Sequence, residues 1–430
     1  MQHSLLMGDD PATFADRRRE PWQRRDVAAL AIVLVAAGVA RLALLPTRGL
    51  AGDIDQFVGW VHHIAASGLA SVYDQNLAFG PVMAYIWGLI AAVDPAFRSV
   101  TDASDPAIAA IMKLPASIAD IGLGLLVAYA LRGRPRWAVA GAAVILLHPA
   151  VIDVSAWWGQ YESIYMLTAL AAVVLAIEGR NGWAAAAIAV SLLTKPQAVA
   201  LLLPFAAWFW ATGGWRGLVR AAAIGGCVTV VLWLPFAAAG GPLNYLRNLG
   251  NYQDEIFNIL SLRAWNMWWL VQEGAAGGVF VRDDAAILGP LTLRHLGYAM
   301  AGLLHLAIAA AIVRRPTPRT LILGLAASVL VFFSFATQMH ERYAFGALVF
   351  LALLVAEPAA RWLSIAFGIV FTLNLLAAVP PTPEIGALLP VSGVLGVAGS
   401  IAMLAITFAA LRMLAATPMD RDGTPAPPGS

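Results

Sequence analysis

The stretch VAALAIVLVAAGVARLALLP, residues 27–46, contains a single charged residue, Arg41, among its 20 positions. A helix of about 20 apolar residues spans the roughly 30 Å hydrocarbon core of a bilayer, so this stretch predicts a transmembrane helix. Similar apolar runs recur between short polar breaks, without the alternation typical of a membrane β-barrel. The candidate spans are residues 27–46, 80–93, 106–131, 137–153, 162–178, 183–194, 197–212, 217–239, 295–313, 320–337, 343–357, 362–379 and 386–412.

The composition agrees with a chain whose solvent is a bilayer. Of the 430 residues, 60% are hydrophobic and only 12% are charged, which is far more apolar than a soluble domain. The net charge of +2 is spread over short arginine clusters, so the chain has no basic stripe for nucleic acid, and nucleic acid is not expected as a partner. We predict an all-α, polytopic integral membrane protein with about 11–13 transmembrane helices.

The arginine clusters predict the orientation, because basic loops stay on the cytoplasmic side. The clusters contain the N-terminal arginines, Arg132, Arg134, Arg136, Arg180, Arg216, Arg220, Arg314, Arg315 and Arg319. Placing them inside predicts a multi-pass plasma-membrane protein with a cytoplasmic N-terminus and its polar chemistry on the external face. The predicted regions are a cytoplasmic tail over residues 1–26, a membrane domain over 27–413 with external loops at 47–79 and 240–294, and a disordered tail over 414–430.

Residues 80–131 leave two topologies open. Two full crossings in this region would place the basic turn at residues 132–136 outside. Either the short stretch 80–93 is re-entrant, or the basic turn breaks the positive-inside rule.

The first external loop carries two carboxylates, Asp53 and Asp55, directly after a predicted span. Two residues apart, they cannot share one face of a helix, but in an extended turn both could point into one cleft, where a carboxylate can act as a general base. The alternative is that both side chains are simply solvated.

A second cluster, Trp158, Gln160 and Glu162, lies between two apolar spans. Indole faces stack on sugar C–H surfaces, and amide and carboxylate oxygens accept sugar hydroxyls, so the cluster predicts a sugar site. Interfacial tryptophans also occur for membrane anchoring alone. The segment 240–294 has the same ambiguity, because its aromatic residues suit either a lid with interfacial helices or an anchoring belt.

A third cluster, His340, Glu341 and Arg342, places three ionisable residues at a helix end. Charges at the membrane edge are costly and by default indicate function, and His340 with Arg342 would suit a phosphate group. The alternative is a salt bridge between Glu341 and Arg342. Lys195, in another predicted external turn, could bind phosphate or simply extend to the interface.

Three more charges lie inside predicted spans. Arg41 could extend outward to the interface, and Lys113 and Asp120, seven residues apart on one helix face, could pair. The sequence contains no phosphate-binding P-loop, no His/Cys metal spacing and no nucleophile elbow, which argues against an ATP-driven pump, a zinc protease and a serine hydrolase.

Four segments, in this order along residues 50–345, resemble the GT-C glycosyltransferases. They are Gly52-Asp53-Ile54-Asp55 followed by Trp60, the turn Trp158–Ser163, the stretch Ser261–Trp269, and Gln338–Tyr343. The pattern is most similar to bacterial relatives of the GPI mannosyltransferases and of the endoplasmic-reticulum glucosyltransferases of N-glycan assembly, which carry G-D-x-E in the first external loop and H-E-[KR] late in the chain.

This resemblance implies a GT-C fold and an inverting transfer of a hexose, mannose first and glucose next. The donor would be a polyprenyl-phosphate-linked sugar, and the acceptor a hydroxyl of a lipid, glycan or protein outside the cytoplasm. Asp53 would be the base, although Asp55 stands where the family often has glutamate, so either carboxylate could be the important one. His340, Glu341 and Arg342 would lie near the donor phosphate, with Asn266 and Trp269 nearby in the lid loop.

No cofactor is expected from these residues. Some members of the broader superfamily hold a divalent metal between acidic loops, but the external acids here are few and scattered. The competing interpretations are a multi-span transporter or lipid-sugar flippase, which would place its site at the bilayer midplane between repeated halves, and a catalytically inactive assembly partner.

Overall fold

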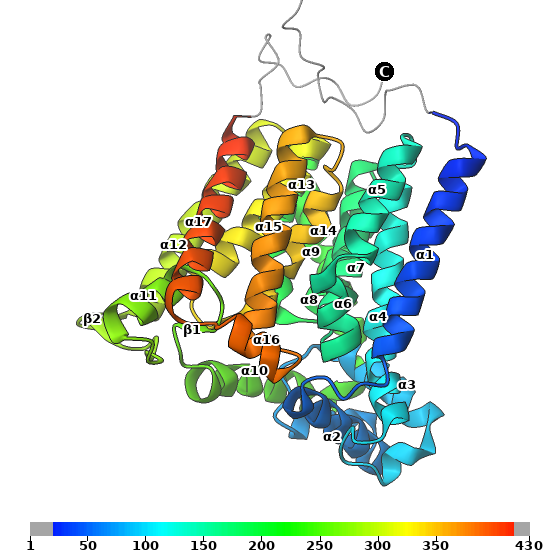
Figure 1. Ribbon diagram of the computed structural model, residues 1–430, viewed down its shortest axis with the longest axis vertical. Coiled ribbons are helices and arrows are strands. Elements are labelled where there is room, and N and C mark those ends of the chain that lie inside the picture. The colour runs from blue at the N-terminus through cyan, green and yellow to red at the C-terminus, as the bar shows by residue number, and fades with distance from the viewer. Residues whose placement is uncertain (1–19, 417–430) are drawn as a thin grey trace, which may run out of the picture.

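The computed structural model describes residues 20–416. Long helices run side by side as one bundle, and both ends of the described chain lie at its upper end in Figure 1. The bundle contains α1 (Arg24–Leu44), α4 (Pro106–Ala130), α5 (Pro135–Leu146), α6 (Pro149–Ile152), α7 (Glu162–Ile177), α8 (Asn181–Leu192), α9 (Val199–Ala237), α12 (Leu293–Arg314), α13 (Pro318–Phe335), α14 (Phe345–Ala352), α15 (Pro358–Ala378) and α17 (Gly393–Ala415).

Shorter elements gather toward the lower end of the bundle in Figure 1, which we call the site end. They include α2 (Ala51–Ser67), η1 (Leu69–Asp74), α3 (Pro81–Val93), η2 (Pro95–Arg98), η3 (Asp153–Trp158), η4 (Pro196–Ala198), α10 (Gly241–Asn251), η5 (Tyr252–Ile256), α11 (Met267–Ala276), η6 (Glu341–Ala344) and α16 (Pro383–Leu388). Four short strands complete the fold: β1 (Ser261–Leu262) pairs in parallel with β4 (Met339–His340), and β2 (Ala286–Leu288) pairs antiparallel with β3 (Leu291–Thr292).

Length and apolarity identify the membrane spans. Within the described residues, seven helical segments are long and apolar enough to cross a membrane, and α5 with α6–η3, bent by 49°, adds an eighth if the bent pair is a single span. The shorter helices α3, α7 and α8 are also apolar. The helix α9 is itself broken at Gly214, where the sequence predicts a boundary between two spans. The prediction of an all-α, multi-pass membrane protein is confirmed.

Burial separates the central helix from the peripheral ones. Nearly all of α13 is buried, as expected for a helix that is apolar on every side, whereas the apolar window of α1 is only 11% buried inside the protein. The helix α1 therefore exposes its apolar side chains outward, which suits a lipid-facing position. The helix α13 leads directly into β4 and η6, so a rigid, fully packed element positions the His340–Arg342 cluster.

The structure decides between the two topologies for residues 80–131. The helix α3 has only 13 residues, and it packs against α2 and η1 at the site end. A single crossing, α4, then leads to the basic turn. There, Trp22 Nε1 donates to the Arg132 carbonyl at 3.1 Å, so the basic turn lies beside the N-terminal segment. This arrangement agrees with the alternative in which residues 80–93 do not cross the membrane.

The charges inside the spans pair differently from the prediction. Arg41 is buried and forms an ion pair with Asp120 at 2.9 Å instead of extending to the interface. Lys113 does not pair with Asp120 but donates to the backbone carbonyl and hydroxyl of Thr47. Asp120 also accepts hydrogen bonds from Ser155 and Ser163, so its partners come from three other segments, which residue spacing along α4 could not indicate.

Of the predicted tails, residues 1–19 and 417–430 lie outside the described residues. Residues 24–26 already belong to α1, and α17 continues to Ala415.

Candidate active site

A cavity of about 680 Å³ lies at the site end of the bundle, where α2, η5, β4, η6 and the start of α9 meet. Five of the residues singled out from the sequence line it: Asp53, Gln160, Lys195, His340 and Arg342. They come from segments nearly 290 positions apart, and the structure brings them into one space. The cavity is within the size range of small-molecule sites.

Asp53 sits in the first turn of α2, where a negative charge interacts favourably with the helix dipole. Its Oδ2 atom accepts hydrogen bonds from Trp158 Nε1 at 3.0 Å and from Gln160 Nε2 at 2.5 Å. No residue between 20 and 416 donates a hydrogen bond to its Oδ1 atom. One oxygen therefore fixes the carboxylate, and the other is available to a ligand.

A glycine turn allows both donors to reach Asp53. Gly159, between Trp158 and Gln160, has a φ of 91° and a ψ of 20°, a left-handed conformation that a side chain disfavours. A Cβ atom at this position would also lie 3.0 Å from Cγ of Lys113. The turn ends η3 and directs the indole and the amide at the same carboxylate oxygen.

The opposite part of the site is a buried cluster of four charges. Lys195 Nζ contacts Glu162 Oε1 at 2.5 Å, and Arg342 Nε lies 3.4 Å from the same oxygen. Arg342 Nη1 also pairs with Glu341 Oε1 at 3.0 Å. Each cation thus has a carboxylate behind it, while Lys195 and Arg342 themselves reach the cavity wall. The cluster combines positive groups at the surface of the cavity with negative groups in the layer below.

Trp158 connects the acidic and cationic parts. The Arg342 guanidinium lies 4.8 Å from the centre of the Trp158 ring, within range of a cation–π contact, while the indole nitrogen donates to Asp53. Trp158 does not line the cavity; it positions two residues that do.

Burial shifts the pKa values of this cluster. It lowers the pKa of Lys195, although the adjacent Glu162 carboxylate opposes this effect. It raises the pKa of Glu341, against the influence of Arg342. Burial, together with Arg342 and Lys195, holds the pKa of His340 well below its usual value.

His340 is accordingly a neutral imidazole. Its Nδ1 atom lies 3.2 Å from Arg342 Nη1 and can only accept there, so the ring proton is assigned to Nε2, which has no partner among the described residues. The expected phosphate-binding charge therefore rests on Arg342 and Lys195, and His340 can contribute a neutral N–H donor.

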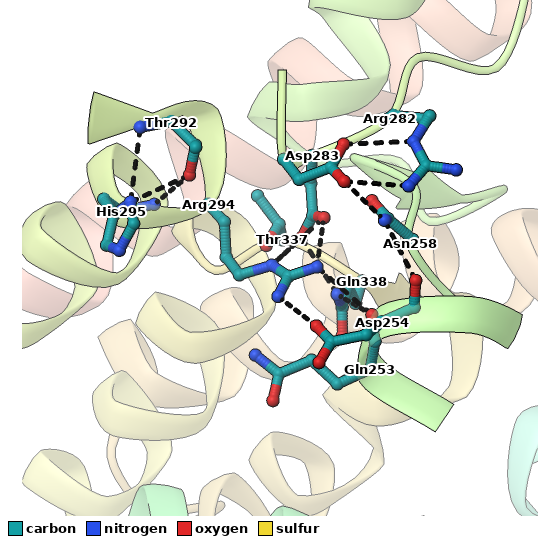
Figure 2. Close-up of polar contacts among 11 residues, drawn as sticks. Gln253, Asp254, Asn258, Arg282, Asp283, Thr292, Arg294, His295, Thr337 and Gln338 are labelled. Carbon is teal, nitrogen blue, oxygen red and sulfur yellow. Dashed lines mark hydrogen bonds and ion pairs between the residues drawn. The ribbon is translucent and has the colours of Figure 1, made fainter. Parts of the chain in front are cut away.

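A second polar network, which the sequence did not predict, holds the cavity wall in place (Figure 2). Asp283 is fully buried and pairs with Arg294 at 2.9 Å. Its Oδ2 atom also accepts from Thr337 Oγ1 at 2.7 Å and from Gln338 Nε2 at 3.0 Å. Thr337 and Gln338 line the cavity and are separated from His340 only by Met339, so Asp283 ties the 240–294 segment to this wall.

The 240–294 segment also forms part of the cavity wall. Tyr252, in η5, lines the cavity and accepts a hydrogen bond from Gln56 of α2 at 3.2 Å. Ser261 and Leu262 pair with Met339 and His340 as adjacent strands. These contacts join residues about 80 to 200 positions apart, and no motif in the sequence marks them.

Three predicted site residues lie elsewhere. Residues 51–67 form the helix α2 instead of an extended turn, so Asp55 points away from Asp53. Asp55 forms an ion pair with Arg48 at 2.8 Å and accepts a hydrogen bond from the backbone N–H of Ala103. Asn266 is buried as the N-cap of α11, where it accepts from Trp269 N at 3.0 Å. Trp269 packs against Trp265 and Ala377 in a separate cluster.

Glu162 and Glu341 take intermediate positions. Neither lines the cavity, but both contact Arg342. The salt bridge between Glu341 and Arg342, one of the two alternatives for that cluster, is present, and Arg342 nevertheless faces the cavity.

The fold and this site define an all-α, multi-pass membrane protein with a charged cavity at one end of its helical bundle. No protein-family model and no curated protein matches the chain. Among solved structures, the chain is similar to the crystal structure of ArnT from Cupriavidus metallidurans bound to undecaprenyl phosphate. The sequence identity is 17%, the match covers 90% of this chain and 77% of that one, and the TM-score is 0.48.

Proposed function

We propose that the protein is an inverting glycosyltransferase of the GT-C type that moves a hexose from a polyprenyl-phosphate carrier to an acceptor hydroxyl, with Asp53 as the general base. The observation that carries this proposal is the presence of Asp53, Lys195 and Arg342 on the walls of one cavity. The motif resemblance supports mannose as the first candidate sugar and glucose as the second.

The reaction requires a base for the attacking alcohol. The acceptor oxygen forms a bond to C1 of the sugar while its proton passes to Asp53, since a hydroxyl is a weak nucleophile at neutral pH. The Oδ1 atom of Asp53 accepts no hydrogen bond from the described residues, and Oδ2 accepts from Trp158 and Gln160, which keeps the carboxylate in a fixed orientation.

The leaving group requires charge stabilisation more than a proton. As the bond between C1 and the phosphate oxygen breaks, its electron pair stays with the polyprenyl phosphate, whose negative charge grows. Arg342 and Lys195 stabilise that charge, and Glu162 and Glu341 hold the two cations before the donor arrives. His340 adds a neutral N–H donor.

The cavity lies at the end of the bundle away from the arginine clusters. If basic loops face the cytoplasm, the cavity opens on the external face, where a lipid, glycan or protein would provide the acceptor hydroxyl. We propose that no metal takes part, because a base and two cations supply the groups that this transfer needs.

The test is transfer by the purified protein with a panel of polyprenyl-phosphate sugars and acceptors, comparing Asp53→Asn with Asp55→Asn. Asparagine can still accept from Trp158 and Gln160, so Asp53→Asn removes the base without removing these contacts. We expect it to lower turnover by about 10²–10⁴-fold, the usual contribution of a general base. Asp55→Asn, which leaves the cavity unchanged, should keep most of the activity, and EDTA should have no effect.

Unchanged turnover by Asp53→Asn would refute the proposed mechanism. The same preparation tests the transporter or flippase alternative, since movement of a labelled lipid-linked sugar across vesicles without transfer to any acceptor would favour it.

A further inference from the structure

A second cavity lies at the opposite end of the bundle. The chain leaves the candidate active site at Lys195, follows the first part of α9 away from it, and turns at Gly214, where φ is 59° and ψ is −160°. The second part of α9 returns to the site end, because Phe236 packs against Tyr73 there. The helix α8 ends beside Lys195, so its first residue also lies at the far end.

The bend and the start of α8 enclose about 820 Å³. Three arginines line this space: Arg180 before α8, and Arg216 and Arg220 on the returning part of α9. The last two are four residues apart and so share one helix face. Phe209 and Ile224 form an apolar part of the same wall. We call this space the bend cavity.

The bend cavity concentrates positive charge that no ion pair among the described residues neutralises. Within residues 20–416, no carboxylate forms an ion pair with Arg180, Arg216 or Arg220. Two other arginines at this end do have such partners: Arg132 pairs with Glu178 at 3.2 Å, and Arg319 with Glu357 at 2.9 Å. Within residues 20–416, exposed arginines such as Arg25 and Arg412 also form no ion pair with a carboxylate, so the feature particular to Arg180, Arg216 and Arg220 is that they line one cavity together.

We propose that the bend cavity binds the phosphate of an anionic membrane lipid. Guanidinium groups match phosphate oxygens with paired hydrogen bonds, and basic pockets between membrane helices bind such headgroups. The apolar wall favours a lipid over a free phosphate ion, because it can contact the glycerol and acyl carbons. Trp183, which lines the cavity with 65% of its surface exposed, suits the headgroup level of a bilayer.

The test measures lipid binding directly. The full-length protein is placed in phosphatidylcholine nanodiscs with increasing phosphatidylglycerol, and bound lipid is counted by native mass spectrometry. Replacing all three arginines, Arg180, Arg216 and Arg220, by glutamine should weaken phosphatidylglycerol binding by about 100-fold. This value assumes that each arginine contributes the attraction to an anionic lipid that is usual for a basic residue near a membrane surface, and that the three contributions add to about 100-fold. The matched control replaces Arg25, Arg314 and Arg412, exposed arginines at the same end, and should change binding by less than about threefold.

Three further measurements keep the result decisive. Size-exclusion and thermal unfolding check that the triple variant folds, and the single variant Arg216→Gln should still show a loss of about fivefold. Equal losses in the triple and control variants would mean that diffuse surface charge attracts the lipid, and would overturn the proposal. Displacement of phosphatidylglycerol by inorganic phosphate would assign the cavity to a soluble anion and would also overturn it. This lipid binding does not depend on the transferase activity proposed above.

Discussion

Removing the charges of Glu162 and Lys195 one at a time and then together should show whether the four-charge cluster is one unit. Glu162→Gln leaves Lys195, whose side chain is only 5% exposed, without its ion-pair partner, while Arg342 keeps Glu341. Leaving one buried charge unpaired costs about 3–5 kcal/mol in the free energy of unfolding. Lys195→Met should lower the free energy of unfolding by about 3 kcal/mol, the lower end of that range. The reason is that Glu162 still has Arg342 as a partner at 3.4 Å.

The double variant removes both charges and leaves Arg342 paired with Glu341. Replacing a whole buried pair is often close to neutral, so the double variant should lie within about 2 kcal/mol of the wild type. The coupling energy between the two positions would then be at least about 4 kcal/mol. The assay is denaturant unfolding of all four proteins in the same detergent micelle.

An exposed pair provides the control. Arg132 and Glu178 are 3.2 Å apart, but their side chains are 40% and 28% exposed. The cycle of Arg132→Met and Glu178→Gln should give a coupling of only about 0.2–1 kcal/mol. If the effects of Glu162→Gln and Lys195→Met add to within about 0.5 kcal/mol, the two residues do not form a buried unit and the reasoning fails.

Three other predictions concern the support of the cavity. Asp283→Asn should lower the free energy of unfolding by about 3 kcal/mol in the same assay, because Arg294 loses a buried ion-pair partner but retains its pair with Asp254 at 2.6 Å. A decrease of less than about 1 kcal/mol would contradict this. Gly159→Ala should lower the free energy of unfolding by about 1–3 kcal/mol, because Gly159 has a left-handed backbone. It should also reduce the proposed sugar transfer, because it displaces Trp158 and Gln160. The control Gly52→Ala, at a position with open space around it, should reduce transfer less. The pKa of His340 is lower in the folded protein than in the unfolded chain, so the unfolded chain binds a proton first as the pH falls, and the free energy of unfolding should fall as the pH drops below about 6.5. Unfolding measured at several pH values should show a smaller fall for His340→Gln. A fall identical to that of the wild type would exclude His340 as its source.

The fold class could be predicted from the sequence because the hydrocarbon core imposes a local rule. Each span, such as residues 27–46, must be apolar over about 20 residues and helical to satisfy its own backbone, and both properties can be read without knowing any partner. The same rule predicted the break near Gly214, whereas the sequence left the end of the bundle on which Arg132 lies open between two topologies. Asp53, Lys195 and Arg342 were found because ionisable side chains at membrane edges are rare.

The roles of individual polar residues could not be predicted in this way. Asp53 and Asp55 are equivalent in the sequence, and only the helical geometry of α2 directs one into the cavity and the other toward Arg48. Asn266 has the right composition for a substrate contact but caps α11.

Charge pairing depends even more on tertiary structure. Asp120 forms an ion pair with Arg41 and not with Lys113. Asp283 accepts a hydrogen bond from Thr337, which lies 54 positions further along the chain. The sequence by itself determined that the chain is an all-α, multi-pass membrane protein, because entry into the membrane depends on each segment's own transfer from water to lipid. The tertiary structure decided which charges meet, because in a low-dielectric interior a charge is tolerated only beside a specific partner, and that partner is set by packing across the whole chain.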